Sequence, residues 1–319
     1  MEIRRVAIVG MGALGMLYGE HIQSAAGKSA VQYVMDSERY RRHKNDVYTV
    51  NGKRQDFILA DCADAAPADL VIVATKYSGL QSALDVMANL VGENTAVLSV
   101  MNGITSEGII AERYGDKNLL SCVALGMDAM REGTDLVYTK KGKLQLGILR
   151  EEQRPALELV ARFFDRIGMP YAVEPDILHA LWGKFLLNVG INQTCMVYET
   201  TYAGALETRE IFETMSAAMR EVIAIARKEG VNLTEEDYRN YIKILRTLKP
   251  DGYPSMRQDA LAKRKSEVEL FAGTVIRIAA KHGVPVPVNE RYYARIREME
   301  AAYEGDRSPA EPGGAEESA

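Results

Sequence analysis

The sequence has few of the features that mark several large classes of protein. Only three of its 319 residues are cysteines, and the spacing of Cys62, Cys122 and Cys195 matches no metal-binding or redox motif. We therefore expect reduced thiols, no metal site and a cytoplasmic location. No run of 18 or more apolar residues is free of charge, and the N-terminus lacks the apolar core of a signal peptide. Neither a membrane span nor a leader is expected.

An excess of basic residues is also missing. The formal net charge is −5, and the short basic clusters at 39–42, 140–143 and 263–265 are flanked by acids. Clusters of this kind are typical of a solvated surface. Nucleic acid is therefore not an expected partner.

Apolar residues make up 47% of the chain, and its length suits two folded domains. In the first half, short apolar runs alternate with helical patterns, which is typical of βαβ units and a parallel sheet. The expected strands lie at 6–9, 31–35, 70–74, 96–100 and 171–173, with a hairpin at 136–138 and 144–147 and helices at 13–25, 79–90 and 154–167.

Beyond residue 176 nearly every segment has helical spacing. The expected helices lie at 176–198, 207–229, 235–248, 256–282 and 289–303. We therefore predict an α/β domain at 1–174 followed by an all-α domain at 175–303. Residues 304–319 are rich in Gly, Pro, Ala, Glu and Ser, and we expect a disordered tail there.

A glycine-rich turn follows the first strand and opens a helix. Its sequence is Gly10-Met11-Gly12-Ala13-Leu14-Gly15, which matches the G-x-G-x-x-G pattern in the context that the pattern requires. The three glycines allow the tight turn, the approach of backbone N–H groups to a pyrophosphate, and close packing of helix on strand. The turn predicts a dinucleotide-binding Rossmann domain.

The end of the second strand bears on the type of dinucleotide. Asp36 stands where an acid would accept hydrogen bonds from the ribose hydroxyls and repel a 2′-phosphate, which favours NAD. Arg39, Arg41 and Arg42 follow closely and could hold that phosphate. The residues alone leave NAD and NADP open.

A polar stripe interrupts an otherwise apolar helix in the second half. Lys184, Asn188 and Asn192 are spaced four residues apart and so share one helix face. Buried polar groups need partners, so this face borders either a structural hydrogen-bond network or a ligand cleft. Farther on, Ser255 stands at a predicted helix N-cap, and Glu267 lies later on the same predicted helix.

Taken together, these motifs resemble those of the ketopantoate reductase (2-dehydropantoate 2-reductase) family over about residues 3 to 300. The matching features occur in the family's order and are the glycine turn, Thr75-Lys76, Asn102-Gly103, the Lys184 stripe, the run from Ser255 to Asp259, and Glu267 ahead of Gly273. The resemblance implies a C-terminal domain like that of 6-phosphogluconate dehydrogenase. It also implies reduction of ketopantoate to (R)-pantoate for coenzyme A synthesis.

The resemblance also implies a role for each site residue. Lys184 would be the general acid, and Glu267 would act near the reacting oxygen and balance the lysine charge. Lys76 and Asn102 would lie at the cofactor, with Asn102 also touching the substrate. Asn188, Asn192 and Ser255 would hold the carboxylate and hydroxyl groups of the substrate. The family resemblance suggests NADP as the cofactor, whereas Asp36 leaves NAD as an alternative.

Some positions depart from the family pattern and leave the substrate open. Gln193 stands where proline is usual, and Tyr202 and Met101 replace residues that are commonly smaller or more polar. One alternative is a reductase of another branched 2-keto acid. A second is a non-catalytic NAD(P) sensor, which would have no need for Lys184. The long C-terminal helices could support a homodimer.

Overall fold

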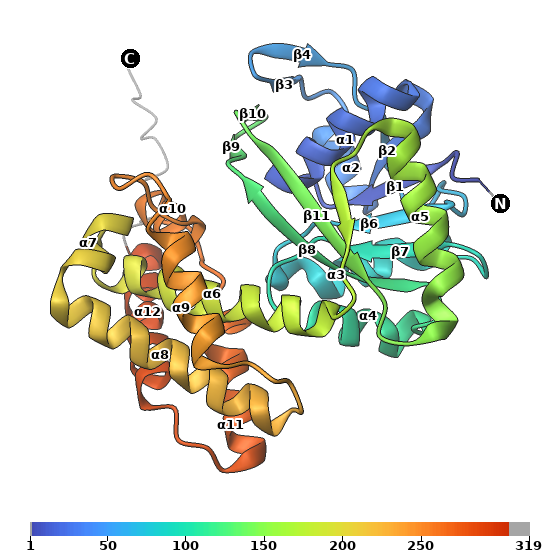
Figure 1. Ribbon diagram of the computed structural model, residues 1–319. Helices are drawn as coiled ribbons and strands as arrows, with labels where there is room; N and C mark the ends of the chain where they lie inside the picture. The colour runs from blue at the N-terminus through green and yellow to red at the C-terminus, as the bar shows by residue number, and fades with distance from the viewer. Residues whose placement is uncertain (1, 306–319) are drawn as a thin grey trace, which may run out of the picture. The chain divides into compact units, whose positions relative to one another are not determined.

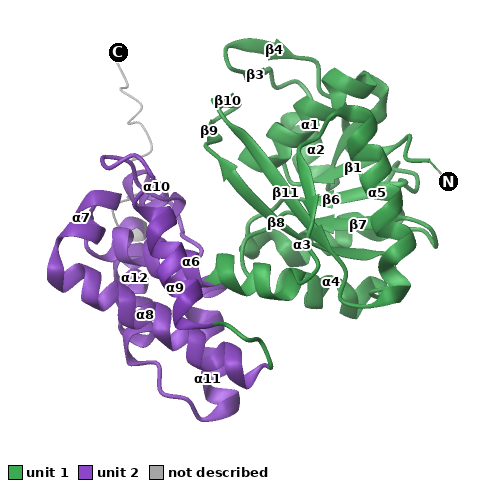
Figure 2. Cartoon of the chain, in the orientation of Figure 1, with its two compact units in different colours: residues 1–185, 230–233 green, residues 186–229, 234–319 purple. Residues whose placement is uncertain are grey.

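The computed structural model describes residues 2–305. The chain forms two compact units, Met1–Phe185 with Gly230–Leu233, and Leu186–Glu229 with Thr234–Ala319 (Figures 1 and 2). We call them unit 1 and unit 2 and describe each separately.

Unit 1 is built on an eight-stranded sheet with the order β12-β11-β8-β7-β6-β1-β2-β5. The six strands from β5 to β8 in that order are all parallel, while β11 pairs antiparallel with β8. The strands are β1 (Val6–Val9), β2 (Val31–Met35), β5 (Leu59–Asp61), β6 (Leu70–Val73), β7 (Ala96–Ser99), β8 (Leu119–Met127), β11 (Lys141–Gly147) and β12 (Tyr171–Val173).

Helices cover both faces of this sheet, because its central strands are apolar on both sides. Residues of α1 and α5 join the core on one face, and residues of α3 and α4 join the core on the other. The helices are α1 (Ala13–Ala26), α2 (Ser37–His43), α3 (Leu80–Val86), α4 (Ser106–Tyr114) and α5 (Arg154–Ile167).

A second, four-stranded sheet corrects one expectation. It has the order β4-β3-β10-β9, with β3 (Tyr48–Val50), β4 (Lys53–Gln55), β9 (Met130–Glu132) and β10 (Asp135–Val137). The expected hairpin between 136–138 and 144–147 is therefore wrong, since β10 pairs with β9 whereas β11 pairs with β8. Gly142 is a strand residue: a Cβ there would lie 2.1 Å from the carbonyl oxygen of Leu125.

Unit 2 is helical. Helix α6 (Ile177–Val197) begins in unit 1 and continues into unit 2. The others are α7 (Tyr202–Glu207), α8 (Arg209–Lys228), α9 (Glu235–Leu245), α10 (Ser255–Leu261), α11 (Thr274–His282) and α12 (Pro287–Gly305).

The single helix expected at 256–282 is wrong. Helix α10 ends at Leu261, and the chain becomes helical again only at a π-helical turn, Glu269–Gly273, which leads into α11. Lys263 adopts a left-handed conformation (φ 48°), which stops α10. Non-glycine residues rarely adopt this conformation, so the sequence gives no sign of the break.

The predicted fold class is confirmed: an α/β Rossmann-like sheet domain precedes an all-helical domain. The boundary at 174/175 stays a prediction. Of the tail expected at 304–319, the first two positions continue α12 and the rest lie outside the described residues. Among the residues described, no helix has the length and apolar character needed to cross a membrane.

Candidate active site

The glycine turn lies between β1 and α1. Gly10 has a φ of 108°, and a Cβ at this position would lie 2.5 Å from the carbonyl oxygen of Ala74. At Gly15 a Cβ would lie 2.0 Å from the carbonyl oxygen of Gly10. Packing within the protein therefore requires both glycines.

Gly12 is different, because nothing in the protein requires a glycine there. Its backbone is extended, and an added Cβ would meet only the carbonyl oxygen of Ala74, at an ordinary 3.7 Å. No side chain of the described residues caps α1, and its first turn carries no acid. The open space at Gly12 and the uncapped N–H groups fit a bound pyrophosphate.

Four predicted cofactor elements lie at one edge of the sheet. In the sheet, β1 lies between β2 on one side and β6 on the other, so the strand order reverses at β1. In open α/β sheets dinucleotides bind at the carboxyl ends of the strands at such a point. The glycine turn, Asp36, Lys76 and Asn102 follow β1, β2, β6 and β7 at this edge. Lys76 is exposed at the start of a 3₁₀ turn, and Asn102 is half-buried.

Asp36 caps helix α2. Its Oδ1 accepts a hydrogen bond of 2.9 Å from the backbone N of Arg39, and its Oδ2 lies 3.7 Å from Nε of the same arginine. The Oγ of Ser37 donates a 2.8 Å hydrogen bond to Asp61, at the end of β5. Because Asp61 pairs with Met35 across the two strands, acidic residues end two neighbouring strands at the edge where the ribose of a dinucleotide is expected.

Arg131 is a residue that no sequence motif indicates. From β9 it donates hydrogen bonds to the carbonyl oxygens of Met11, in the glycine turn, and of Gly133. Burial is the main cause that lowers its pKa. Its contact with Met11 spans 120 positions of the chain, so no local motif could have indicated it.

Lys184 lies on α6. The residue keeps some exposed area, but its ammonium group is desolvated, and burial lowers its pKa from 10.5 to about 8. No charge among the described residues contributes to that shift. A lysine with this pKa can give up its proton near neutral pH.

Asn188 and Asn192 follow Lys184 along α6 and are 4% and 5% exposed. Gln193, the neighbour that replaces a family proline, accepts a 3.1 Å hydrogen bond from the backbone N of Ala272 and donates one of 3.1 Å to Asn289. Gln193 therefore supports the core of unit 2.

The remaining predicted residues need a correction in their local structure. Ser255 is the first residue of α10, and Pro254, not Ser255, is its N-cap. Glu267 does not lie within a long helix but in the break before the π-helical turn, where its carbonyl oxygen accepts from the backbone N of Leu270 at 3.0 Å. The predicted roles of Ser255 and Glu267 stay predictions.

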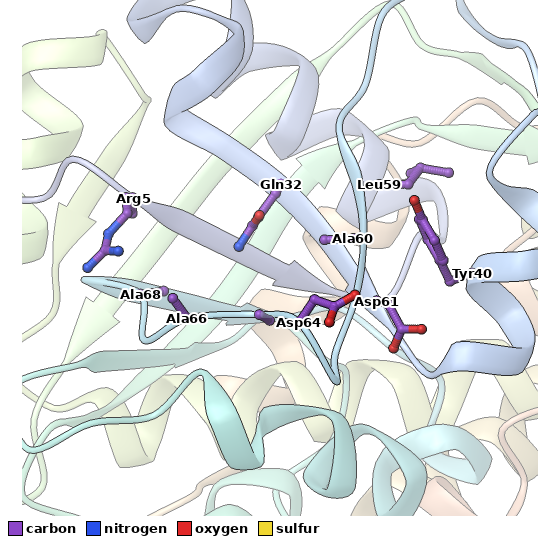
Figure 3. A pocket seen from close by; sticks show the side chains of 10 residues that line it. Arg5, Gln32, Tyr40, Leu59, Ala60, Asp61, Asp64, Ala66 and Ala68 are labelled. Atoms are coloured by element: carbon purple, nitrogen blue, oxygen red, sulfur yellow. The ribbon is translucent and has the colours of Figure 1, made fainter.

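A separate pocket of about 400 Å³ lies on unit 1, with Arg5 at one end and Tyr40 and Asp61 at the other (Figure 3). None of the predicted site residues lines it. Among the residues described, no group of three or more His, Cys, Asp and Glu side chains is placed to hold a metal ion.

Comparison with known protein families distinguishes a reductase from a non-catalytic NAD(P) sensor. The model of ketopantoate reductase PanE/ApbA matches residues 6–151, and the model of the C-terminal part of the same family matches 176–300. The chain belongs to the ketopantoate reductase family. It is therefore an NAD(P)-dependent oxidoreductase that reduces 2-keto acids, and the alternative of a non-catalytic sensor is wrong.

Relatives match this ketopantoate reductase family member over nearly its full length. It is 26% identical to a 2-dehydropantoate 2-reductase of Aquifex aeolicus, over 90% of this chain and 94% of the relative. The figure for a Halobacterium salinarum 2-dehydropantoate 2-reductase is 27%, over 89% and 95%.

Solved structures share the fold. A dimeric ketopantoate reductase from Staphylococcus aureus is 22% identical with a TM-score of 0.78, and the match covers 94% of this chain and 99% of that one. D-Mandelate dehydrogenase in complex with NADH and anilino(oxo)acetate is 21% identical with a TM-score of 0.84, with the same coverage. The fold thus accompanies more than one 2-keto acid chemistry.

Proposed function

We propose that this protein reduces 2-dehydropantoate to (R)-pantoate, the step that feeds pantothenate and coenzyme A synthesis. The observation that carries the proposal is Lys184, an ammonium desolvated on α6 in line with two buried amides. A donor of this kind suits a carbonyl oxygen that becomes an alkoxide. The full-length match to 2-dehydropantoate 2-reductases supports the choice of substrate.

The chemistry divides among the residues as follows. When bound, the reduced nicotinamide supplies the hydride. Lys184 Nζ would give a proton to the carbonyl oxygen of the substrate, which takes up the carbonyl π electrons on reduction. Asn188, Asn192 and Ser255 hold the carboxylate and hydroxyl groups, and Glu267 lies near the reacting oxygen.

The residues of unit 1 fit the dinucleotide. The open space at Gly12 and the uncapped start of α1 receive the pyrophosphate, while Lys76 and Asn102 stand at the same edge. We propose that NADH is preferred over NADPH. The support is the pair Asp36 and Asp61 at the ribose end, where Arg39 is already engaged by Asp36.

A second candidate is a reductase of another 2-keto acid. The observation that favours it is the likeness to D-mandelate dehydrogenase, whose TM-score exceeds that of the Staphylococcus aureus ketopantoate reductase. Tyr202, which departs from the family pattern, would then accompany a differently shaped substrate cleft.

The decisive experiment is a rate comparison of 2-keto acids. Purified protein is given NADH or NADPH with ketopantoate, 2-ketoisovalerate or phenylglyoxylate, and the loss of absorbance of the reduced cofactor is followed. We expect the highest kcat/KM with ketopantoate and NADH. A higher kcat/KM with 2-ketoisovalerate or phenylglyoxylate would show that ketopantoate is not the preferred substrate. A preference for NADPH would overturn the role given to Asp36.

The expected assembly is a homodimer, supported by the dimeric Staphylococcus aureus relative. The mass of the protein in solution, by light scattering, tests this. The cytoplasmic location stays a prediction.

A further inference from the structure

Glu107 is a buried carboxyl group that the proposed reaction does not use. It lies in the first turn of α4, and 9% of it is exposed. Asn102, which is predicted to contact the cofactor, lies five residues earlier, in the loop between β7 and α4. Burying a carboxylate is costly, so its hydrogen bonds are of interest.

A chain of hydrogen bonds leads from Glu107 to this loop. Ser106 Oγ donates to Glu107 Oε2 at 2.8 Å, and Ser99 Oγ lies 2.9 Å from Ser106 Oγ. A hydroxyl has one proton to donate, so Ser99 must donate to Ser106 when Ser106 donates to the carboxylate. Ser99 Oγ in turn accepts from the backbone N of Met101, at 3.4 Å.

The end of this chain adjoins both cofactor loops. Met101 directly precedes Asn102, and its sulfur accepts a hydrogen bond of 3.6 Å from the hydroxyl of Thr75. Thr75 precedes Lys76. The Met101 position is therefore tied to the carboxylate through Ser99 and Ser106, and to the Lys76 loop through Thr75.

We propose that Glu107 is a positioning residue that fixes the Val100–Met101 peptide, directly before Asn102, through Ser106 and Ser99, and so sets the place of Asn102 at the cofactor. This inference rests on the proposed contact between Asn102 and the cofactor. The ionised carboxylate gives the chain one direction, because it can only accept.

The effect depends on pH. Burial raises the pKa of Glu107 to about 7, while Ser106 and the backbone N–H groups of Glu107 and Cys122 favour the charged form. The titratable group that faces it is the thiol of Cys122 on β8, with Tyr18 of α1 beyond. Burial raises the pKa of both, so they stay neutral near pH 7. Below pH 7 the protonated carboxyl can donate to Ser106, and the chain loses its fixed direction.

The test measures NADH binding directly, by quenching of Trp182, which is the sole tryptophan of the sequence. Wild type, Glu107→Gln, Ser106→Ala, Asn102→Ala and the double variant Asn102→Ala/Glu107→Gln are titrated at pH 6 and pH 8. We expect wild type to bind several-fold more tightly at pH 8. We expect Glu107→Gln and Ser106→Ala to bind about tenfold more weakly than wild type at pH 8, with little pH dependence.

The double variant separates positioning from general damage. If Glu107 acts through Asn102, adding Glu107→Gln to Asn102→Ala costs no further affinity. The same loss in both backgrounds would overturn the inference, as would wild-type affinity at pH 8 in Glu107→Gln, or equal affinity of wild type and Asn102→Ala. A wild type that binds NADH in this pattern but does not turn over ketopantoate would overturn the proposed function alone.

Discussion

Lys184 lowers the stability of the fold that carries it. Its pKa falls from 10.5 in the unfolded chain to about 8 in the folded one, because burial disfavours the charge. Below pH 8 both states hold the proton and the whole cost, at most about 3 kcal/mol, is present. Between pH 8 and 10.5 only the unfolded state holds the proton, so stability rises with pH in that window.

Replacing this lysine by an apolar side chain should therefore stabilise the protein. We expect Lys184→Met to raise the free energy of unfolding at pH 7 by about 1 to 3 kcal/mol, with a smaller gain above pH 10. Urea unfolding followed by the fluorescence of the buried Trp182 measures this. Lys143→Met, at an exposed position of β11, is the matched control and should change stability little. A loss of stability in Lys184→Met would show that the ammonium has a compensating partner.

At the scale of elements, the glycines at the start of α1 have two different functions. Gly10 and Gly15 are needed for folding, whereas Gly12 leaves space for the ligand. Gly12→Ala should leave stability within about 1 kcal/mol of wild type, because the added Cβ meets only an ordinary contact. It should weaken NADH binding about tenfold or more, since the Cβ enters the space for the pyrophosphate.

Gly10→Ala is the comparison for this prediction. There the Cβ would meet backbone atoms at 2.5 Å in a conformation that favours glycine, so stability should fall clearly. Melting temperatures and NADH titrations of both variants give the result. Unchanged NADH affinity in a well-folded Gly12→Ala protein would place the pyrophosphate elsewhere.

Elements whose pattern is continuous in sequence could be predicted. The apolar runs of β1 and β6, and the periodic spacing of α5 and α6, locate these elements to within a residue or two. Prediction failed where one residue takes an unusual conformation or a long-range pairing decides. Lys263 ends a helix without glycine or proline, and Gly142 lies within β11 although it resembles a turn residue.

The candidate site divides in the same way. The glycine turn and the Lys184 stripe are local motifs, so spacing was enough to find them. The contact of Arg131 depends on the pairing of distant segments, and the chain from Glu107 to Met101, although local in sequence, depends on burial. A glutamate in the first turn of a helix is usually a surface residue, and its sequence context does not distinguish this buried one.

At the scale of the whole molecule, the residues proposed for cofactor binding and those proposed for substrate binding belong to different units. The predicted dinucleotide residues all belong to unit 1, and Asn188, Asn192, Ser255 and Glu267 all belong to unit 2. Lys184 is next to the last residue of unit 1 before α6 continues into unit 2. The proposed general acid thus lies on α6, a helix that is divided between the two units.

The central claim is that this chain reduces a 2-keto acid with Lys184 as its proton donor. The measurement that tests it most directly is the single-turnover rate of NADH oxidation by saturating ketopantoate, in wild type and in Lys184→Ala, with NADH affinity measured alongside. We predict a rate lower by about two or more orders of magnitude in Lys184→Ala, with NADH affinity within about twofold of wild type. A near-normal rate in that variant would contradict the account.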